Sequence, residues 1–257
     1  MEIIPTSQSL NLKGSILVVP IVSTGNVSQL AIDLMVCTLG LERVGIVDCD
    51  YVVPVVGGRE GGEGGITTPL ELYGKAGLNV VFLQQRSPVM KTFKDDFVKG
   101  LKSLVLGNEI SALFILSGMD LSDRPDAHMN SPTYHLIPAL LTNHEGKLHP
   151  AVHELAIHFP PLITTTNQTP GTELPVIPGS GVTRKLVSSL SPEFPCMGVI
   201  LEYVLEGDNR ADAALLASAL SRSLHKELGM TENERWKEPP SWQQGLFGTA
   251  HDQSLFG

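Results

Sequence analysis

The feature that most constrains the fold is a change of hydrophobic period within residues 20–40, PIVSTGNVSQLAIDLMVCTLG. The run at 15–22 is short, aliphatic and rich in β-branched residues, which is typical of a buried strand. After a Ser-Thr-Gly-Asn turn, apolar side chains recur over 27–38 at the spacing of one helix face. Asn26 or Thr24 is placed to cap that helix. The stretch therefore predicts a strand that leads into an amphipathic helix, the building unit of an α/β domain.

The rest of the chain alternates between apolar runs of strand length and amphipathic runs of helix length. Strands are predicted at 43–48, 51–56, 66–73, 78–86, 110–116 and 196–205, and helices at 90–106, 134–141, 151–157 and 211–228. The predicted strand at 110–116 is a continuous apolar run, as expected of a strand that is covered on both faces, and 196–205 is the last predicted core strand. The pattern predicts a layered α/β domain with a central, mostly parallel or mixed sheet flanked by helices.

The chain of 257 residues changes character near its end. We expect residues 1–229 to form a single α/β domain, and residues 230–257 to form an extended C-terminal tail. Both tryptophans of the chain, Trp236 and Trp242, lie in this tail. Because a disordered linker rarely holds two tryptophans, the first half of the tail is expected to lie along the domain and the final residues to hang free.

Charge and composition exclude several classes of partner. The net charge is -9, with 18 Lys and Arg against 27 Asp and Glu, and the basic residues are scattered, so no nucleic-acid partner is expected. No apolar run approaches the ~20 residues that span a bilayer, so no membrane partner is expected. Three cysteines without a CxxC pair indicate buried thiols in a reducing compartment. The N-terminus lacks the basic region of a secretory signal, and an intracellular protein is expected.

Two glycine-containing turns raise the question of anion binding. The loop GGREGGEGG at 57–65 has bare backbone amides, but no Lys-Ser or Lys-Thr follows it and two glutamates lie within it. The turn at 179–185 ends in Arg184 and Lys185, which would suit a phosphate at a helix start. A surface loop and a tight connection are the simpler interpretations, and no cofactor is predicted.

Six of the eight histidines fall between residues 118 and 175. His149 and His153 are four apart and could share one helix face, but Pro150 puts His149 at a helix cap and no third ligand stands out. We therefore expect solvent-exposed histidines and no metal site. The run Glu-Gly-Asp-Asn at 206–209 is expected to cap the following helix rather than to act in catalysis.

Catalytic motifs are equally scarce. The sequence has no GxSxG elbow, no set of kinase motifs and no GxGxxG after a strand, so no catalytic residue is assigned and the protein is not expected to be an enzyme. The alternative is a nucleoside phosphorylase-like or hydrolase-like enzyme, with an anion held at 57–65 or at 179–185.

Several segments together resemble the proteasome assembly chaperone family of eukaryotes. They are PIVSTGNVSQLAIDL at 20–34, VVPVVG at 52–57, IPGSGVT at 177–183, LEGDN at 205–209, and RWKEPPSW with GLFG within 235–248. The similarity is distributed over about half of the chain, in the order that the family shows.

The resemblance implies a phosphorylase- or hydrolase-like α/β fold without a catalytic role. It also implies a heterodimer with proteasome assembly chaperone 1 and binding to α subunits of the proteasome core particle. Such a protein promotes assembly of the α-ring and the core particle, blocks aberrant α-ring dimers, and is found in the cytoplasm and nucleus.

The resemblance gives the last three residues, Leu255, Phe256 and Gly257, a specific meaning. The α-ring pockets accept C-termini of the form hydrophobic residue, tyrosine, any residue, through capture of the terminal carboxylate. Phe256 keeps the ring of the usual tyrosine but lacks its hydroxyl, whose hydrogen bond is worth about 1 kcal/mol. These three residues are therefore predicted to bind the α-ring.

Overall fold

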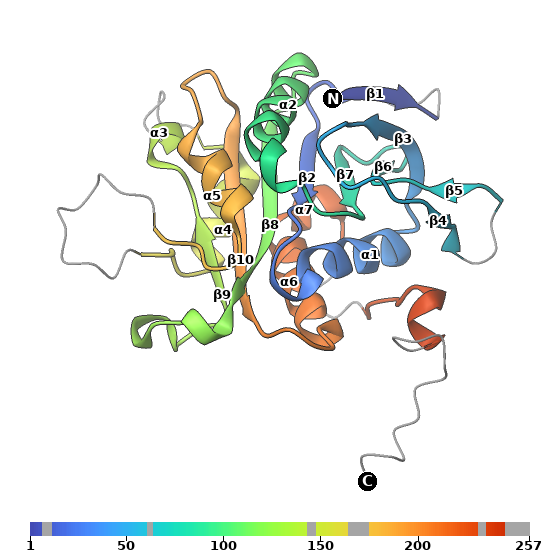
Figure 1. Ribbon diagram of the computed structural model, residues 1–257. Coiled ribbons are helices and arrows are strands. Elements are labelled where there is room, and N and C mark those ends of the chain that lie inside the picture. The colour runs from blue at the N-terminus through green and yellow to red at the C-terminus, as the bar shows by residue number, and fades with distance from the viewer. Residues whose placement is uncertain (7–11, 61–63, 143–147, 164–174, 231–234, 245–257) are drawn as a thin grey trace, which may run out of the picture.

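The computed structural model describes residues 1–6, 12–60, 64–142, 148–163, 175–230 and 235–244 (Figure 1). Its strands are β1 (Glu2–Pro5), β2 (Ile16–Pro20), β3 (Glu42–Asp48), β4 (Gly57–Gly58), β5 (Ile66–Thr67), β6 (Leu70–Gly74), β7 (Val80–Gln85), β8 (Ala112–Asp120), β9 (Thr133–Leu136) and β10 (Cys196–Val204). Its α-helices are α1 (Val27–Leu39), α2 (Lys94–Gly107), α3 (Ala139–Thr142), α4 (Pro150–His158), α5 (Gly181–Ser188), α6 (Arg210–Ser223) and α7 (His225–Leu228). Short 3-10 turns are η1 (Thr24–Asn26), η3 (Lys91–Phe93), η4 (Leu121–Asp123), η5 (Asp126–His128) and η6 (Pro240–Gln244).

The main sheet has eight strands in the order β1-β3-β6-β7-β2-β8-β10-β9. The four strands β7, β2, β8 and β10 are parallel to one another, and the strands that flank them on both sides pair antiparallel. This mixed sheet, covered by helices, confirms the predicted layered α/β fold. A separate two-stranded ribbon is formed by β4 and β5.

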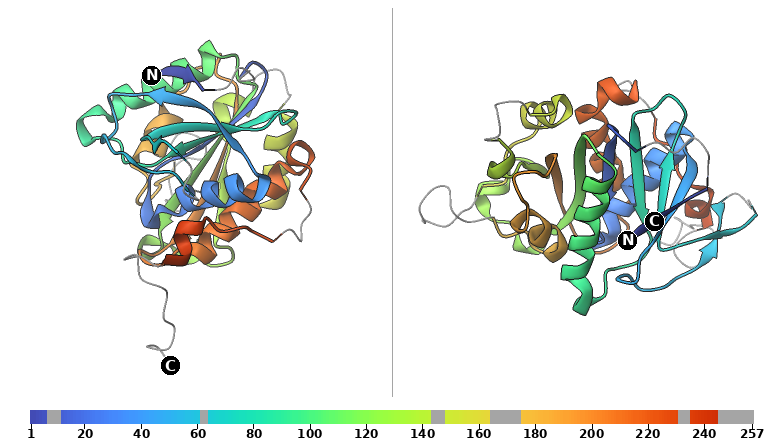
Figure 2. Two further views of the ribbon diagram at one scale, coloured as in Figure 1. Left: turned by 90° about the vertical axis from the view of Figure 1, so that its right-hand side faces the viewer. Right: turned by 90° about the horizontal axis from the view of Figure 1, so that it is seen from above.

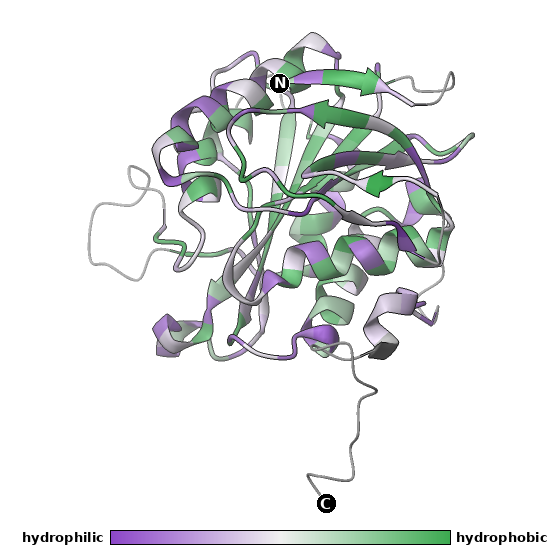
Figure 3. Ribbon diagram, turned by 45° about the vertical axis from the view of Figure 1, so that its right-hand side comes forward, coloured by the Kyte–Doolittle hydropathy of each residue, from purple (hydrophilic) through white to green (hydrophobic). Residues whose placement is uncertain are grey.

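Helices cover both faces of the sheet, and each face has its own hydrophobic core (Figure 2). On one face α2 and α5 bury side chains such as Phe97 and Leu186, and on the other α1, α4 and α6 bury side chains such as Ile32 and Leu216. Alternate residues of β8 serve the two cores, with Leu113 on one face and Phe114 on the other. The central strands are accordingly hydrophobic along most of their length (Figure 3).

Residues 15–40, where the hydrophobic period changes, form the predicted strand, turn and helix. All five residues of β2 are buried, and Gly40, the residue that follows the end of α1, has a left-handed backbone (φ 60°) that suits glycine. The predicted side-chain cap is wrong. Asn26 is the N-cap residue but makes no capping hydrogen bond, and its Oδ1 instead accepts from Gln29 Nε2 at 3.3 Å.

Two predicted elements are wrong. The expected strand at 51–56 is reduced to a single bridge between Val52 and Val89, because Pro54 lacks an amide for a ladder and the residues that follow Val52 are exposed. The expected helix at 134–141 is divided at Pro138 into the end of β9 and the short α3. The loop expected at 57–65 includes β4, which pairs with β5.

Two further observations concern composition. No disulfide joins Cys37, Cys49 and Cys196, and each of these side chains is half-buried. Within the described ranges, no helix is both long enough and apolar enough to cross a membrane.

Candidate interaction site at the C-terminal segment

The residues predicted to bind the α-ring, Leu255, Phe256 and Gly257, lie outside the described residues. The structure does describe the segment that leads to them, residues 235–244, which we call the C-terminal strap. Its position decides where the last residues of the chain begin.

The C-terminal strap is fixed at three places along its length. Trp236 Nε1 donates to Ser218 Oγ of α6 at 3.1 Å, and the amide of Lys237 donates to Thr38 Oγ1 of α1 at 2.9 Å. At η6, the amide of Ser241 donates to Glu60 at 3.1 Å, and the Ser241 hydroxyl bonds the other oxygen of the same carboxylate.

The two tryptophans of the C-terminal strap, Trp236 and Trp242, are partly buried and pack against the core beneath α1 and α6. Aromatic rings contribute much apolar area to such contacts. The first part of the tail therefore lies along the helix layer, as its two tryptophans predicted. In Figure 1 it crosses below α1 toward the β4–β5 ribbon.

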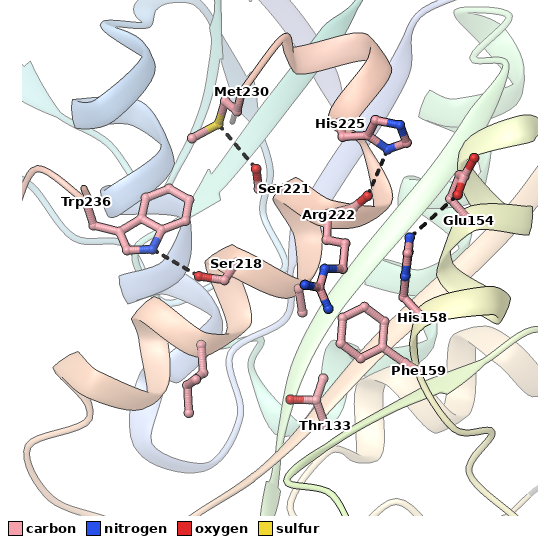
Figure 4. Close-up of a pocket in the computed structure, with 12 residues that line it drawn as sticks. Thr133, Glu154, His158, Phe159, Ser218, Ser221, Arg222, His225, Met230 and Trp236 are labelled. Carbon is pink, nitrogen blue, oxygen red and sulfur yellow. Dashed lines mark hydrogen bonds and ion pairs between the residues drawn. The ribbon is translucent and has the colours of Figure 1, made fainter. Parts of the chain in front are cut away.

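A groove of about 780 Å³ opens beside the C-terminal strap, between α4, α6 and Trp236 (Figure 4). Its apolar lining includes Phe159, Leu215, Met230 and Trp236, and Leu215 is 51% exposed. We call it the α4–α6 groove. It combines residues from five separate parts of the chain, so no local sequence pattern could have revealed it.

Ionisable groups surround the α4–α6 groove. Glu154 Oε1 accepts a hydrogen bond from Lys226 at 2.6 Å, and this bond lowers the pKa of the Glu154 carboxyl. His158 Nε2 lies 3.6 Å from the same carboxylate. The charged rim of the groove is thus largely paired within the chain.

Glu202, a buried residue of β10, pairs in register with Thr133 of the groove lining. The Thr133 hydroxyl donates to its Oε2 at 3.4 Å, and Oε1 has no hydrogen-bond partner among the described residues. Burial, together with the nearby Asp212 carboxylate, raises the pKa of Glu202 to about 8. The side chain is therefore mostly protonated at neutral pH, which avoids the cost of a buried charge.

Three of the segments that carry the family resemblance meet at the carboxyl ends of β2, β8 and β10. The amide of Gly25 donates to Glu206 Oε1 at 3.2 Å, and Asn209 Nδ2 donates to the carbonyl of Gly25 at 3.1 Å. The amide of Gly118 donates to Ser23 Oγ at 2.7 Å. We call this cluster the motif junction.

Close packing fills the motif junction. A Cβ added at Gly118 would lie 2.6 Å from the carbonyl oxygen of Thr24, and a Cβ at Gly25 or Gly179 would also collide with neighbours. In open α/β sheets this edge is the usual place for a ligand. Here the chain's own turns occupy that edge, so the segments at 20–34, 177–183 and 205–209 pack against one another and have a structural role.

The two candidate anion sites are also used by internal contacts. The Ser180 hydroxyl bonds Ser117 and Thr183 inside the protein, and Lys185 pairs with Asp95. At the loop of 57–65, the Glu60 carboxylate accepts from the C-terminal strap.

The expected exposure of the histidines is wrong at two positions. His128 and His135 are buried, because His128 Nδ1 bonds the Tyr203 hydroxyl at 2.9 Å and His135 Nδ1 bonds the Phe159 carbonyl at 2.7 Å. His149 does cap α4, as predicted, by accepting from the amide of Ala151. The described part of the chain contains no group of three His, Cys, Asp or Glu side chains placed to hold a metal ion.

Of the two residues Asp208 and Asn209, both expected to cap α6, only one does so with its side chain. Asp208 Oδ1 accepts from the amide of Arg210 at 3.3 Å and supports the first turn. Asn209, the N-cap residue, makes no side-chain cap and holds Gly25 instead.

Comparison with known proteins identifies relatives along nearly the whole chain. Residues 17–235 match the PAC2 family. The chain is 31% identical over 256 residues to proteasome assembly chaperone 2 of Danio rerio, covering 95% of each protein. It is 30% identical over 267 residues to proteasome assembly chaperone 2 of Homo sapiens, covering 98% of this chain and 99% of the relative.

Among solved structures, the fold is similar to Pyrococcus furiosus PbaA, described as an archaeal homolog of proteasome-assembly chaperone. The TM-score is 0.61 at 18% identity, covering 90% of this chain and 87% of that chain. The resemblance found in the sequence is confirmed, and the chain belongs to the PAC2 family.

Proposed function

We propose that this chain is a proteasome assembly chaperone that pairs with proteasome assembly chaperone 1 and binds α subunits of the proteasome core particle. In this role it promotes α-ring and core-particle assembly and blocks aberrant α-ring dimers. The observation that carries the proposal is the near full-length similarity to proteins named proteasome assembly chaperone 2.

The C-terminal strap supports a role for the last residues in this function. Its bonds to α6, α1 and Glu60 hold the start of the remaining chain at one place on the molecule. Capture of a terminal carboxylate gains from such an anchor, because fewer orientations are lost on binding. We propose that Leu255, Phe256 and Gly257 enter a pocket of the α-ring.

Pull-down tests the proposal directly. The full chain, tagged at its N-terminus, is expected to recover proteasome assembly chaperone 1 and α subunits from a cell lysate. A variant that lacks Leu255, Phe256 and Gly257 is expected to retain proteasome assembly chaperone 1 but to bind isolated α-rings more weakly. Absence of both partners from the full-length pull-down would refute the proposed function, and unchanged α-ring affinity would refute the role of the tail.

We also propose that the function involves no catalytic step. The filled motif junction supports this, since the edge of the sheet that commonly binds ligands is used for internal packing. Incubation of the purified chain with nucleosides, with and without phosphate, is expected to give no turnover. Release of a free base at a steady enzymatic rate would contradict the proposal.

The proposed locations are the cytoplasm and the nucleus, where proteasome cores are assembled and used. Imaging of the chain fused to a fluorescent protein at its N-terminus tests this, since that arrangement leaves the last residues unchanged. Restriction of the signal to a membrane-bound organelle would contradict it.

A further inference from the structure

Four exposed aliphatic side chains flank the β4–β5 ribbon. Val53 and Val55 are 38% and 39% exposed, Val56 is 75% exposed, and Ile66 is 54% exposed. Val56 directly precedes β4, and Ile66 of β5 pairs with Gly58. We call Val53, Val55, Val56 and Ile66 the apolar strip.

The local sequence explains why the apolar strip is uncovered. Pro54 prevents regular pairing of 53–56 with the main sheet, and both residues of β4 are glycines that add no side chain over their neighbours. The ribbon pairs only within itself among the described residues, outside the eight-stranded sheet. Exposed aliphatic side chains that gather near one element of a fold commonly mark a surface for another protein.

The C-terminal strap reaches the same ribbon. Ser241 bonds Glu60, which is two residues beyond the end of β4, and η6 ends at Gln244. The described part of the chain therefore ends three residues after a contact with the loop that follows β4, and thirteen residues follow it in the sequence. Thirteen residues span at most about 45 Å, so whatever holds Gly257 must lie within that distance of η6. The far end of the sheet, with α3 and β9, is on the opposite side of the molecule (Figure 1).

We propose that the apolar strip contacts the α-ring surface beside the pocket that receives the C-terminus. This inference rests on the proposed function, because it uses the α-ring as the partner. The strip and the terminal carboxylate then form two linked contacts with one partner, and each raises the effective concentration of the other. The α-ring surface that faces the strip presents apolar side chains.

Binding of the full chain to isolated α-rings tests the proposal. The strip variant carries Val55→Ser and Val56→Ser together, and the matched control is Val176→Ser, a valine that is 71% exposed on the segment before α5. The strip variant is expected to raise the Kd at least tenfold, which corresponds to about 1.4 kcal/mol. The control is expected to change the Kd less than twofold. All three substituted positions are exposed, so the thermal stability of both variants is expected to stay close to that of the wild type.

The outcomes separate the two proposals. If the wild type binds α-rings and the strip variant binds equally well, the strip inference is refuted while the proposed function stands. If the wild type does not bind α-rings, the proposed function fails, and the strip inference fails with it. If the strip variant loses proteasome assembly chaperone 1 but keeps its α-ring affinity, the strip belongs to the heterodimer and the inference is refuted.

Discussion

Replacement of Glu202 by Gln is expected to make stability less dependent on pH. Glu202 lies fully buried on β10, with one hydrogen bond from Thr133 and an unpartnered Oε1. Burial, with a smaller contribution from the Asp212 carboxylate, raises its pKa from 4.5 to about 8. Glutamine has the same shape and carries no charge in either the folded or the unfolded state, so the substitution removes only the titration.

The sign of the effect follows from the direction of the pKa shift. Between pH 4.5 and about 8 the unfolded chain releases the proton while the folded protein keeps it. The free energy of unfolding therefore falls by about 1.4 kcal/mol for each pH unit in this window. The contribution is fully present below pH 4.5 and is lost as the pH rises through the folded pKa. From pH 5 to pH 7 the wild type should lose about 3 kcal/mol that Glu202→Gln keeps.

Urea unfolding, followed by tryptophan fluorescence at pH 5 and pH 7, measures this difference. The advantage of Glu202→Gln over the wild type is expected to grow by about 3 kcal/mol between the two pH values. Asp95→Asn is the control. The hydrogen bond from Lys185 lowers the pKa of the Asp95 carboxyl, so this group titrates below pH 5 in both the folded and the unfolded state. The difference in unfolding free energy between Asp95→Asn and the wild type should therefore be the same at pH 5 and pH 7. A difference in unfolding free energy between Glu202→Gln and the wild type that does not change with pH would refute the reasoning.

Three further predictions concern packing, the C-terminal strap and the tail. Gly118→Ala is expected to cost about 2–4 kcal/mol in unfolding free energy, because its Cβ would lie 2.6 Å from a backbone carbonyl, whereas Gly58→Ala points into open space and should cost under about 0.5 kcal/mol; equal denaturation midpoints would contradict this. Trp236→Ala removes the strap's bond to α6, and tryptic cleavage after Lys237 should become about tenfold faster, while an unchanged rate would show that the indole does not hold the strap. Phe256→Tyr restores a hydroxyl worth about 1 kcal/mol and should tighten α-ring binding about fivefold by surface plasmon resonance; equal or weaker binding would argue against the proposed pocket.

The parts of the fold that the sequence predicted well are those with a local cause. The helix α1 and the strands β8 and β10 follow from residue spacing and from continuous apolar runs, which depend only on nearby residues. The strand predicted at 51–56 failed because its apolar residues find no partner strand beyond the single bridge between Val52 and Val89. Val53, Val55 and Val56 face solvent while Val52 is buried, a result that only the tertiary arrangement determines.

The candidate site was harder to predict from the sequence, because its contacts also depend on the tertiary arrangement. Trp236 and Trp242 showed that the tail contacts the domain, but Thr38 and Glu60, which hold it, lie about 180 to 200 residues earlier. The buried His128 likewise depends on Tyr203, 75 residues away. Partners at such separations leave no periodic signal in the sequence.

The place of β10 in the sheet has a consequence for the order in which the protein is built. β9 pairs only with β10 among the described strands, yet β9 emerges from the ribosome some 60 residues before its partner. The strap bonds to α1 and to Glu60 form later still, when residues 237 and 241 have been made. During synthesis the first three-quarters of the chain therefore has an unpaired edge at β8 and an uncovered patch over α1. On a ribosome stalled before residue 196, the edge of β8 and the patch over α1 would both be exposed to other proteins.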